Sequence, residues 1–290
     1  MKTRLLVSVF FALVILGGCR LIVKPETTPA SVDTATTMPQ TVEVTFTRIA
    51  DTLSGPEMLE GGYTTVTFTN SADQPYELTL VRLREGVTPE EFELLATAAE
   101  DGTGESLGAL LEVAEIYGGV AAIPPGASAS AAVTLAEGRY LAFSSNYEGG
   151  VEARFDFDVS GSNGAQAPVA DREITMFEFG FGIDAEIPAG KELWRISNIG
   201  EQLHHVMIFP VEPGTTIEDV NAALSQPGEP AFVTGPPVVT SATFTGGISN
   251  DLTVELAPGS YGVICFVPDI ETGLPHAALG MVSLVTVPGS

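Results

Sequence analysis

Short stretches of alternating apolar and polar residues follow one another through most of the chain after residue 40. In residues 62–70 (GYTTVTFTN) and 190–198 (GKELWRISN), apolar side chains recur at about every second position, the period of a half-buried strand. The 31 glycines and 20 prolines are scattered between such stretches, which suits strands joined by turns better than long helices. We therefore expect an all-β fold with short helices confined to the connections.

The pattern occurs twice along the chain, which indicates an internal repeat. Residues 62–92 align without a gap on residues 190–220, and each copy has an alternating strand, a polar turn, a second strand and a helix start. Thr88 and Thr216 each stand three residues before a carboxylate, an arrangement that caps the first turn of a helix. The repeat predicts two β-sandwich domains.

A second block of the repeat sets the domain boundaries. Residues 133–140 recur 121 positions later, against 128 for the first block, so the first copy has seven additional residues between the blocks. This insertion includes an expected helix at 107–117. Residues 160–171 (SGSNGAQAPVAD) have the composition of a linker. We expect one domain at 41–160 and the other at 171–290.

The N-terminus has the features of an export signal. A basic start precedes an apolar stretch at 5–16, which is too short to span a membrane. The following Leu-Gly-Gly-Cys19 resembles the lipobox of bacterial lipoproteins, in which the signal is cut before a cysteine that then carries lipid. We expect 1–18 to be a signal peptide and 19–40 to be a lipidated, flexible tether. An ordinary secretory signal is the alternative. The resemblance implies an extracytoplasmic protein of the cell envelope, anchored to a bacterial membrane through lipid on Cys19.

The charge of the chain is strongly acidic, with 37 acidic against 12 basic residues and a net charge of −25. Too few cationic side chains are present to neutralise phosphates, which argues against nucleic acid as a partner. An acidic field steers basic molecules toward a protein, so a basic redox partner protein fits the charge. A charge of this kind also keeps a protein soluble whatever its partners.

The histidines and the one free cysteine of the mature chain all lie in the second copy. The histidines are His204, His205 and His276, and Met281 follows the last of them. After signal cleavage Cys265 is the remaining cysteine, with no partner for an intramolecular disulfide. Two imidazoles, a thiolate and a weak axial thioether are the ligands of copper centres that alternate between Cu(I) and Cu(II).

The first copy has no histidine and no cysteine. Tyr76 stands opposite His204 in the alignment, and Ser144 stands opposite Cys265. Residues that serve only packing would be replaced independently of one another. The ligands of a metal would be replaced together, because the loss of one leaves the others without a function. We therefore expect 41–160 to be a degenerate domain without metal ligands.

The segment from Cys265 to Met281 resembles the cupredoxins, the family of plastocyanin, azurin and the cupredoxin domains of copper nitrite reductases. Their motif is a histidine on one strand, followed later by a Cys-loop-His-loop-Met segment that joins the last two strands. The resemblance covers 171–290 by motif and 41–160 only through the repeat. It implies two tandem cupredoxin-like Greek-key β-sandwich domains and one type 1-like copper ion, held by His204, Cys265, His276 and Met281, with His205 as the alternative upstream ligand.

Two features depart from the family pattern. Ten residues separate Cys265 from His276, a longer loop than in the small electron-transfer members, so we expect a more open site. His205 stands where many cupredoxins have an asparagine after the first ligand, which removes a restraint on the thiolate.

The function that these residues predict is single-electron transfer by a membrane-anchored, extracytoplasmic copper protein. Copper capture and delivery is one alternative, and the long loop suits an exchangeable ion. A partner-binding lipoprotein that keeps only the fold is another. An enzyme is not expected, because copper nitrite reductases and multicopper oxidases need a second, histidine-rich copper centre and this chain has three histidines.

Overall fold

The structure is a computed structural model that describes residues 42–289 except 100–102, 147–152, 225 and 227–229. The expected signal peptide at 1–18, the tether at 19–40 and the lipidated Cys19 lie outside the described residues. No helix in the described part of the chain combines the length and the apolar character that crossing a membrane requires.

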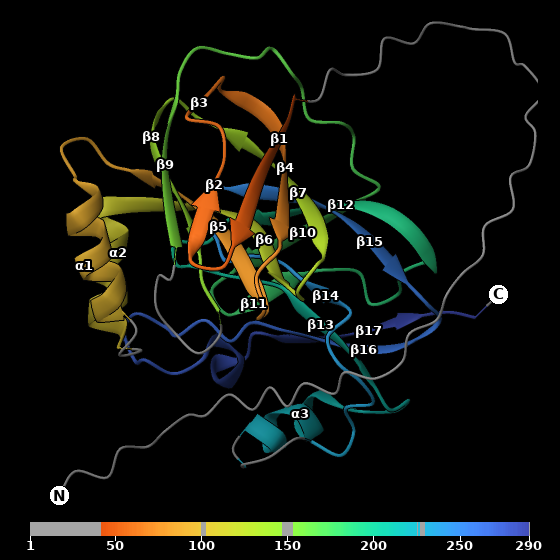
Figure 1. The fold of residues 1–290 in the computed structure, drawn as a ribbon. Helices are drawn as coiled ribbons and strands as arrows, with labels where there is room; N and C mark the ends of the chain where they lie inside the picture. The colour runs from red at the N-terminus through yellow and green to blue at the C-terminus, as the bar shows by residue number, and fades with distance from the viewer. Residues whose placement is uncertain (1–41, 100–102, 147–152, 225, 227–229, 290) are drawn as a thin grey trace, which may run out of the picture.

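The described chain is mostly β-structure, with helices confined to the connections (Figure 1). The N-terminal half runs from β1 to β9 and also holds α1 (Pro89–Ala99) and α2 (Gly104–Val113), which form a helical hairpin between β5 and β6. Its strands are β1 (Val42–Ile49), β2 (Thr52–Ser54), β3 (Met58–Leu59), β4 (Gly62–Asn70), β5 (Tyr76–Leu83), β6 (Ala114–Ile123), β7 (Ser128–Leu135), β8 (Gly138–Ser144) and β9 (Ala153–Val159).

The C-terminal half runs from β10 to β17 and holds α3 (Ile217–Leu224) and the 3₁₀ helix η1 (His276–Leu279). Its strands are β10 (Arg172–Phe177), β11 (Gly180–Gly182), β12 (Gly190–Asn198), β13 (Met207–Val211), β14 (Val239–Thr240), β15 (Ser249–Leu256), β16 (Gly259–Ile264) and β17 (Val282–Val287).

The strands form three sheets, of which the largest spans both halves. Its order is β11-β10-β12-β15-β7-β4-β1-β2, so four strands come from each half. The N-terminal half adds a second sheet, β3-β9-β8-β5-β6, and the C-terminal half adds β14-β13-β16-β17. In both halves the chain crosses repeatedly between the two sheets, as in Greek-key sandwiches. The predicted all-β fold with short helices in its connections is confirmed.

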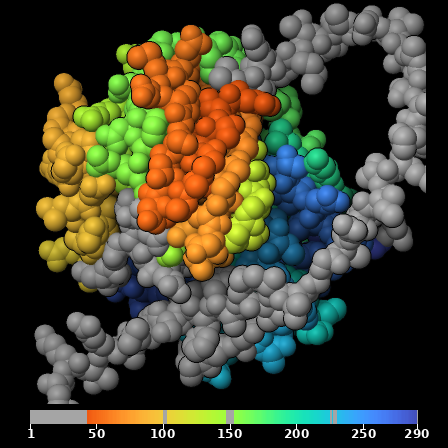
Figure 2. All heavy atoms as spheres, in the orientation of Figure 1, coloured from red at the N-terminus to blue at the C-terminus, as the bar shows by residue number. Residues whose placement is uncertain are grey.

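The large sheet is continuous because β7 pairs antiparallel with β15, with Val133 opposite Asn250. Figure 2 shows this face, where β7 (yellow-green) lies between the orange strands of the N-terminal half and the blue of the C-terminal half. The buried Asn250 side chain donates to the carbonyl of Tyr117 (2.9 Å) and accepts from the amide of Gly119 (3.1 Å). Hydrogen bonds from one side chain therefore tie the two halves together at the junction.

The internal repeat is visible in matching hydrogen bonds. The Asn70 side chain donates to the carbonyl of Gln74 at 2.8 Å, and the Asn198 side chain donates to the carbonyl of Gln202 at the same distance. Each asparagine also accepts from an amide two residues later, closing the same polar turn. Both halves therefore build the β4–β5 and β12–β13 connections alike.

Helix starts follow the expected caps, but one helix differs from its predicted range. The amide of Glu91 donates to Thr88 Oγ1, and that of Asp219 donates to Thr216 Oγ1, each at 3.1 Å. The helix expected at 107–117 instead begins at Gly104 and ends at Val113. The prediction was wrong at its end because Ala114 is already extended and opens β6, which pairs with β5 along its length.

One apolar cluster joins the halves. It contains Phe92 and Leu110 of the helical hairpin together with Trp194, Val263 and Cys265 of the C-terminal sandwich. A second cluster fills the N-terminal sandwich around Phe46, Phe68 and Tyr140. The core that surrounds Cys265 is therefore built partly from the N-terminal half.

Candidate metal centre

Three separate segments of the C-terminal half bring their side chains to one point. His204 lies just before β13 and forms an isolated bridge with Phe244, Cys265 directly follows β16, and His276 opens η1. All three side chains are fully buried, and within the described residues they form the one group of His, Cys, Asp or Glu close enough to share a metal ion. The upstream histidine is thus held by a single bridge rather than by a regular strand.

The donor atoms of these side chains form a compact triangle. His204 Nδ1 and His276 Nδ1 are 3.0 Å apart, and Cys265 Sγ lies 4.0 Å from the first and 3.7 Å from the second. The point equidistant from the three corners lies about 2.1 Å from each, the circumradius of a triangle with these sides, and protein–metal bonds to nitrogen and sulfur are about 2.0–2.3 Å long. The triangle has the size that one transition-metal ion requires.

Both imidazole rings are oriented by oxygen atoms behind them. His276 Nε2 lies 3.2 Å from Gln202 Oε1, and His204 Nε2 lies 3.4 Å from Glu178 Oε1. These acceptors assign the proton of each neutral ring to Nε2, which leaves the Nδ1 lone pairs directed toward the thiol. Two nitrogen lone pairs that converge beside a sulfur are the arrangement that a cation satisfies.

The Gln202 amide is itself fixed. Its Nε2 donates to Asp269 Oδ1 at 2.8 Å, and its Oε1 accepts from the amide of Ile270 at 2.9 Å. Asp269 is held in turn by the amide and the hydroxyl of Thr272. The loop between Cys265 and His276 therefore supplies the groups that hold the His276 ring through Gln202.

Burial sets the protonation of the three groups. It raises the pKa of the Cys265 thiol to about 11, against the opposing effect of backbone hydrogen bonds from His205 and Val267. Burial and then the neighbouring His204 lower the pKa of His276 to about 4, and burial also lowers the pKa of His204. At neutral pH the rings are therefore uncharged and able to bind a metal ion, whereas the thiol must lose its proton first.

Met281 lies beside the same group. Its side chain is fully buried in the apolar cluster that contains Cys265. Its amide donates to the carbonyl of His276 at 2.9 Å, and its carbonyl accepts from the amide of Cys265 at 3.4 Å. The backbone thus ties the thioether residue to both the thiol and one imidazole.

His205 does not join the triangle. Its amide donates to Cys265 Sγ at 3.5 Å, but its ring faces away and Nε2 accepts from the amide of Phe266 at 2.9 Å. Burial lowers the pKa of this ring to about 4, in keeping with a neutral acceptor. Of the two upstream candidates, the structure places His204 in the group and His205 outside it.

The long loop does not open the site, contrary to the sequence-based expectation. His204, Cys265, His276 and Met281 are each 0% exposed. The loop folds back over the site through a turn in which the amide of Gly273 donates to the carbonyl of Asp269 at 2.8 Å. The ring of Phe179 covers His276 edge-on, with the ring centroids 5.3 Å apart.

In the N-terminal half, a buried arginine contacts the residues that align with His204 and Cys265. The Arg48 side chain is fully buried, its guanidinium lies 3.6 Å from the centroid of the Tyr76 ring, and Nη1 donates to the carbonyl of Ser144 at 2.8 Å. Tyr76 and Ser144 are the residues that align with His204 and Cys265. A fixed cationic side chain thus contacts the counterparts of two of the grouped residues.

Sequence reasoning did not identify the residues behind the imidazoles. Glu178 precedes the repeated blocks, and Asp269 lies in a loop without a counterpart. Gln202 aligns with Gln74 in the polar turn that both copies share, and a residue found in both copies does not point to a site that only one copy has. The turn role is also real, since the Gln202 carbonyl accepts from Asn198.

Comparison with known proteins gives weak likenesses only. No family model and no curated protein matches the chain. Among solved structures, reduced auracyanin from Roseiflexus castenholzii is 23% identical, with 41% of this chain and 96% of that chain covered at a TM-score of 0.28. A multicopper oxidase is 18% identical (86% and 88% covered, TM-score 0.24), and the copper nitrite reductase from Nitrosomonas europaea is 13% identical (87% and 95%, TM-score 0.25). At these TM-scores the likenesses carry no argument about the chemistry of this chain.

Proposed function

We propose that the C-terminal half binds one copper ion and that the protein transfers single electrons outside the cytoplasm of a bacterium. His204 Nδ1, His276 Nδ1 and Cys265 Sγ would hold the ion, with the Met281 thioether as a weak axial contact. Copper bound there would supply a one-electron centre that alternates between Cu(I) and Cu(II).

One observation supports this proposal above the others: a thiol and two imidazole nitrogens, from segments 61 and 11 residues apart, form a triangle sized for a single ion. Two nitrogens and one sulfur suit copper, whereas hard cations such as Mg²⁺ and Ca²⁺ prefer oxygen. Zn²⁺ accepts the same donors, so metal selectivity is part of the test.

The closed geometry favours electron transfer over copper capture and delivery. A delivery site has to expose a ligand to the receiving protein, whereas these four side chains are fully buried. The residues behind the rings, Gln202 and Glu178, restrain them from moving when the charge of the centre changes. Buried and fixed ligands suit a centre that keeps its ion.

The sequence supports the cellular setting and the partner that we propose. The lipobox-like segment supports attachment to a membrane through lipid on Cys19, and the net charge of −25 supports a basic redox partner protein that is steered electrostatically. A carrier is favoured over an enzyme, because three histidines cannot also furnish a second copper centre.

The test is to load residues 41–290 with Cu(II) and record the visible absorption spectrum and the metal content. We expect one copper per chain and an intense thiolate-to-copper band that Cys265→Ser removes. Adjacent histidines provide a matched pair: His204→Gln should abolish the band, and His205→Gln should retain it because that ring lies outside the triangle.

A colourless protein, or one that binds Zn²⁺ but no stoichiometric copper, would refute the proposal. If His205→Gln lost the band and His204→Gln kept it, the ligand would be His205, and the assignment of His204 would be wrong.

A further inference from the structure

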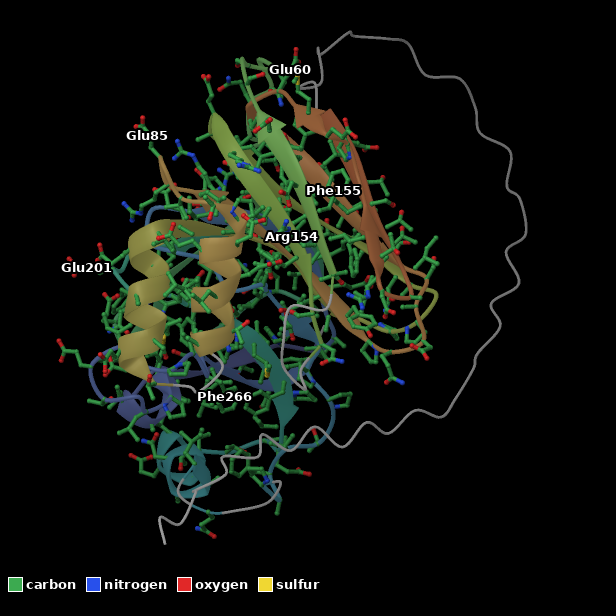
Figure 3. The ribbon with its side chains drawn as sticks, turned by 60° about the vertical axis from the view of Figure 1, so that its left-hand side comes forward. Glu60, Glu85, Arg154, Phe155, Glu201 and Phe266 are labelled. Carbon is green, nitrogen blue, oxygen red and sulfur yellow. The ribbon has the colours of Figure 1, made fainter. Side chains whose placement is uncertain are left out.

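The helical hairpin of the N-terminal half reaches the loop that connects Cys265 and His276. Gly104, the first residue of α2, packs directly on the backbone of Ile270: a Cβ built on Gly104 would overlap the Ile270 carbonyl and lie 2.7 Å from its Cα. A shallow groove beside this contact is lined by residues 103–105 of the hairpin and 270–273 of the loop. In Figure 1 the lower ends of α1 and α2 stand over this blue loop, and in Figure 3 Phe266, at the start of the same loop, is labelled below the two helices.

Ile270 is hydrogen-bonded to Gln202, the residue that orients the His276 ring. Its amide donates to Gln202 Oε1 (2.9 Å), the same oxygen that faces His276 Nε2 at 3.2 Å. Asp269 Oδ1 holds the other end of the Gln202 amide. A backbone shift at Ile270 therefore displaces the oxygen that orients the His276 ring.

The N-terminal half also reaches the other imidazole. Tyr117 of β6 bridges to Phe244, which bridges in turn to His204, with the His204 amide 3.3 Å from the Phe244 carbonyl. The Thr245 amide donates to the carbonyl of Ile116 at 2.9 Å. Both imidazoles of the site are thus held by backbone that rests on the N-terminal half.

We propose that Gly104 is a positioning residue for the metal site, which acts on His276 through Ile270 and Gln202. The N-terminal half thereby serves as a clamp on the loop between Cys265 and His276. Glycine is required at 104 because the two backbones touch, and any side chain there pushes the loop or the helix away. The inference builds on the proposed function for the identity of the metal, but the contacts that link Gly104 to His276 are all between protein atoms.

Two glycines of α2 provide a matched pair of variants. Gly104→Ala adds a methyl group into the Ile270 backbone, whereas Gly108→Ala adds one where nothing lies within 4 Å. Both residues lie in the same helix, and Gly104 has no left-handed backbone conformation that an alanine would strain. Any difference between the variants therefore reports the contact with the loop.

The first measurement uses metal-free protein labelled with ¹⁵N-histidine, whose spectrum holds the ring signals of three residues at most. In the native protein and in Gly108→Ala, the His276 Nε2 proton should exchange slowly, because it is buried and bonded to Gln202. In Gly104→Ala its exchange should accelerate by about tenfold or more, since local opening exposes it. Gln202→Met, which lacks the acceptor oxygen, should show the same acceleration and keeps the test valid if Gly104→Ala folds poorly.

The second measurement uses copper-loaded protein. Gly104→Ala and Gln202→Met should shift the thiolate-to-copper band and release copper to a chelator faster, whereas Gly108→Ala should match the native protein. Identical His276 exchange in Gly104→Ala and Gly108→Ala would overturn the inference even if copper binds normally. Absence of copper binding in every variant would refute the proposed function instead, and the exchange measurement would still decide the role of Gly104.

Discussion

Two adjacent histidines do different work at this site. The His204 ring is fully buried, with Nδ1 facing the thiol, whereas the His205 ring turns away and accepts the amide of Phe266. Neighbouring residues of a strand face opposite ways, so the sequence predicts that the two rings diverge. The sequence could thus predict that one of the two joins Cys265, but the choice depends on Glu178, which lies far away in the chain and accepts from only one of them.

The protonation of Cys265 gives a prediction at the scale of one atom. Burial raises the pKa of this thiol to about 11, so it carries its proton at pH 7, whereas a metal ion binds the thiolate. The pKa of His276 is lowered to about 4, so this ring is neutral at pH 7 and has no proton to release from Nδ1. Copper binding at pH 7 should therefore release about one proton per ion.

Calorimetry in two buffers with different ionisation enthalpies measures this proton directly. Cys265→Ser should release none, and His205→Gln should still release one. Release of two or more protons at pH 7 would contradict a site whose imidazoles are already neutral.

At the scale of the strand and helix, the sequence predicts what depends on neighbours in the chain. The caps at Thr88 and Thr216 and the polar turns at Asn70 and Asn198 recur in both copies, and the structure has them. The sequence does not reveal local structure that depends on residues distant in the chain. The switch from helix to strand at Ala114 is one example, because pairing with β5 overrides the local helical pattern.

One ion pair between strands gives a pH-dependent prediction. The guanidinium of Arg172 on β10 bonds both carboxylate oxygens of Glu192 on β12, at 3.0 and 3.2 Å, and lowers the pKa of that carboxyl. A lowered folded-state pKa adds stability above the unfolded value of about 4.3, and the gain is lost as the pH falls through the folded value. Glu192→Gln should therefore cost about 1–2 kcal/mol at pH 7 and much less at pH 3.

Urea denaturation at the two pH values measures the difference. Glu43→Gln, at an exposed position of β1, is the control and should change the free energy of unfolding little at either pH. An equal cost of Glu192→Gln at both pH values would show that the ion pair does not contribute.

At the scale of the whole molecule, the two halves share a sheet and a core. The eight-stranded sheet crosses from β7 to β15, and the apolar cluster around Cys265 includes Phe92 and Leu110 of the N-terminal half. The repeat predicts two similar units but carries no information on how they join, because the joining residues differ between the copies. Asn250 is an example: it aligns with Ala129, whose small side chain could not make the same bonds.

A shared sheet and core should make the halves unfold together. We expect a single denaturation transition for residues 41–290, with fluorescence of Trp194 and far-ultraviolet circular dichroism changing at the same urea concentration.

Asn250→Ala leaves the buried carbonyl of Tyr117 and the amide of Gly119 without their partner, so it should cost about 1–3 kcal/mol. It should also separate the two probes, because the Trp194 signal reports only the C-terminal half. Thr253→Ala, at an exposed position of the same strand, should change the free energy of unfolding little and should not separate the two probes. Two separate transitions in the native protein would mean that β7 and β15 pair without coupling the stability of the halves. The contact of α2 with the loop between Cys265 and His276 would then act on an independently stable C-terminal half.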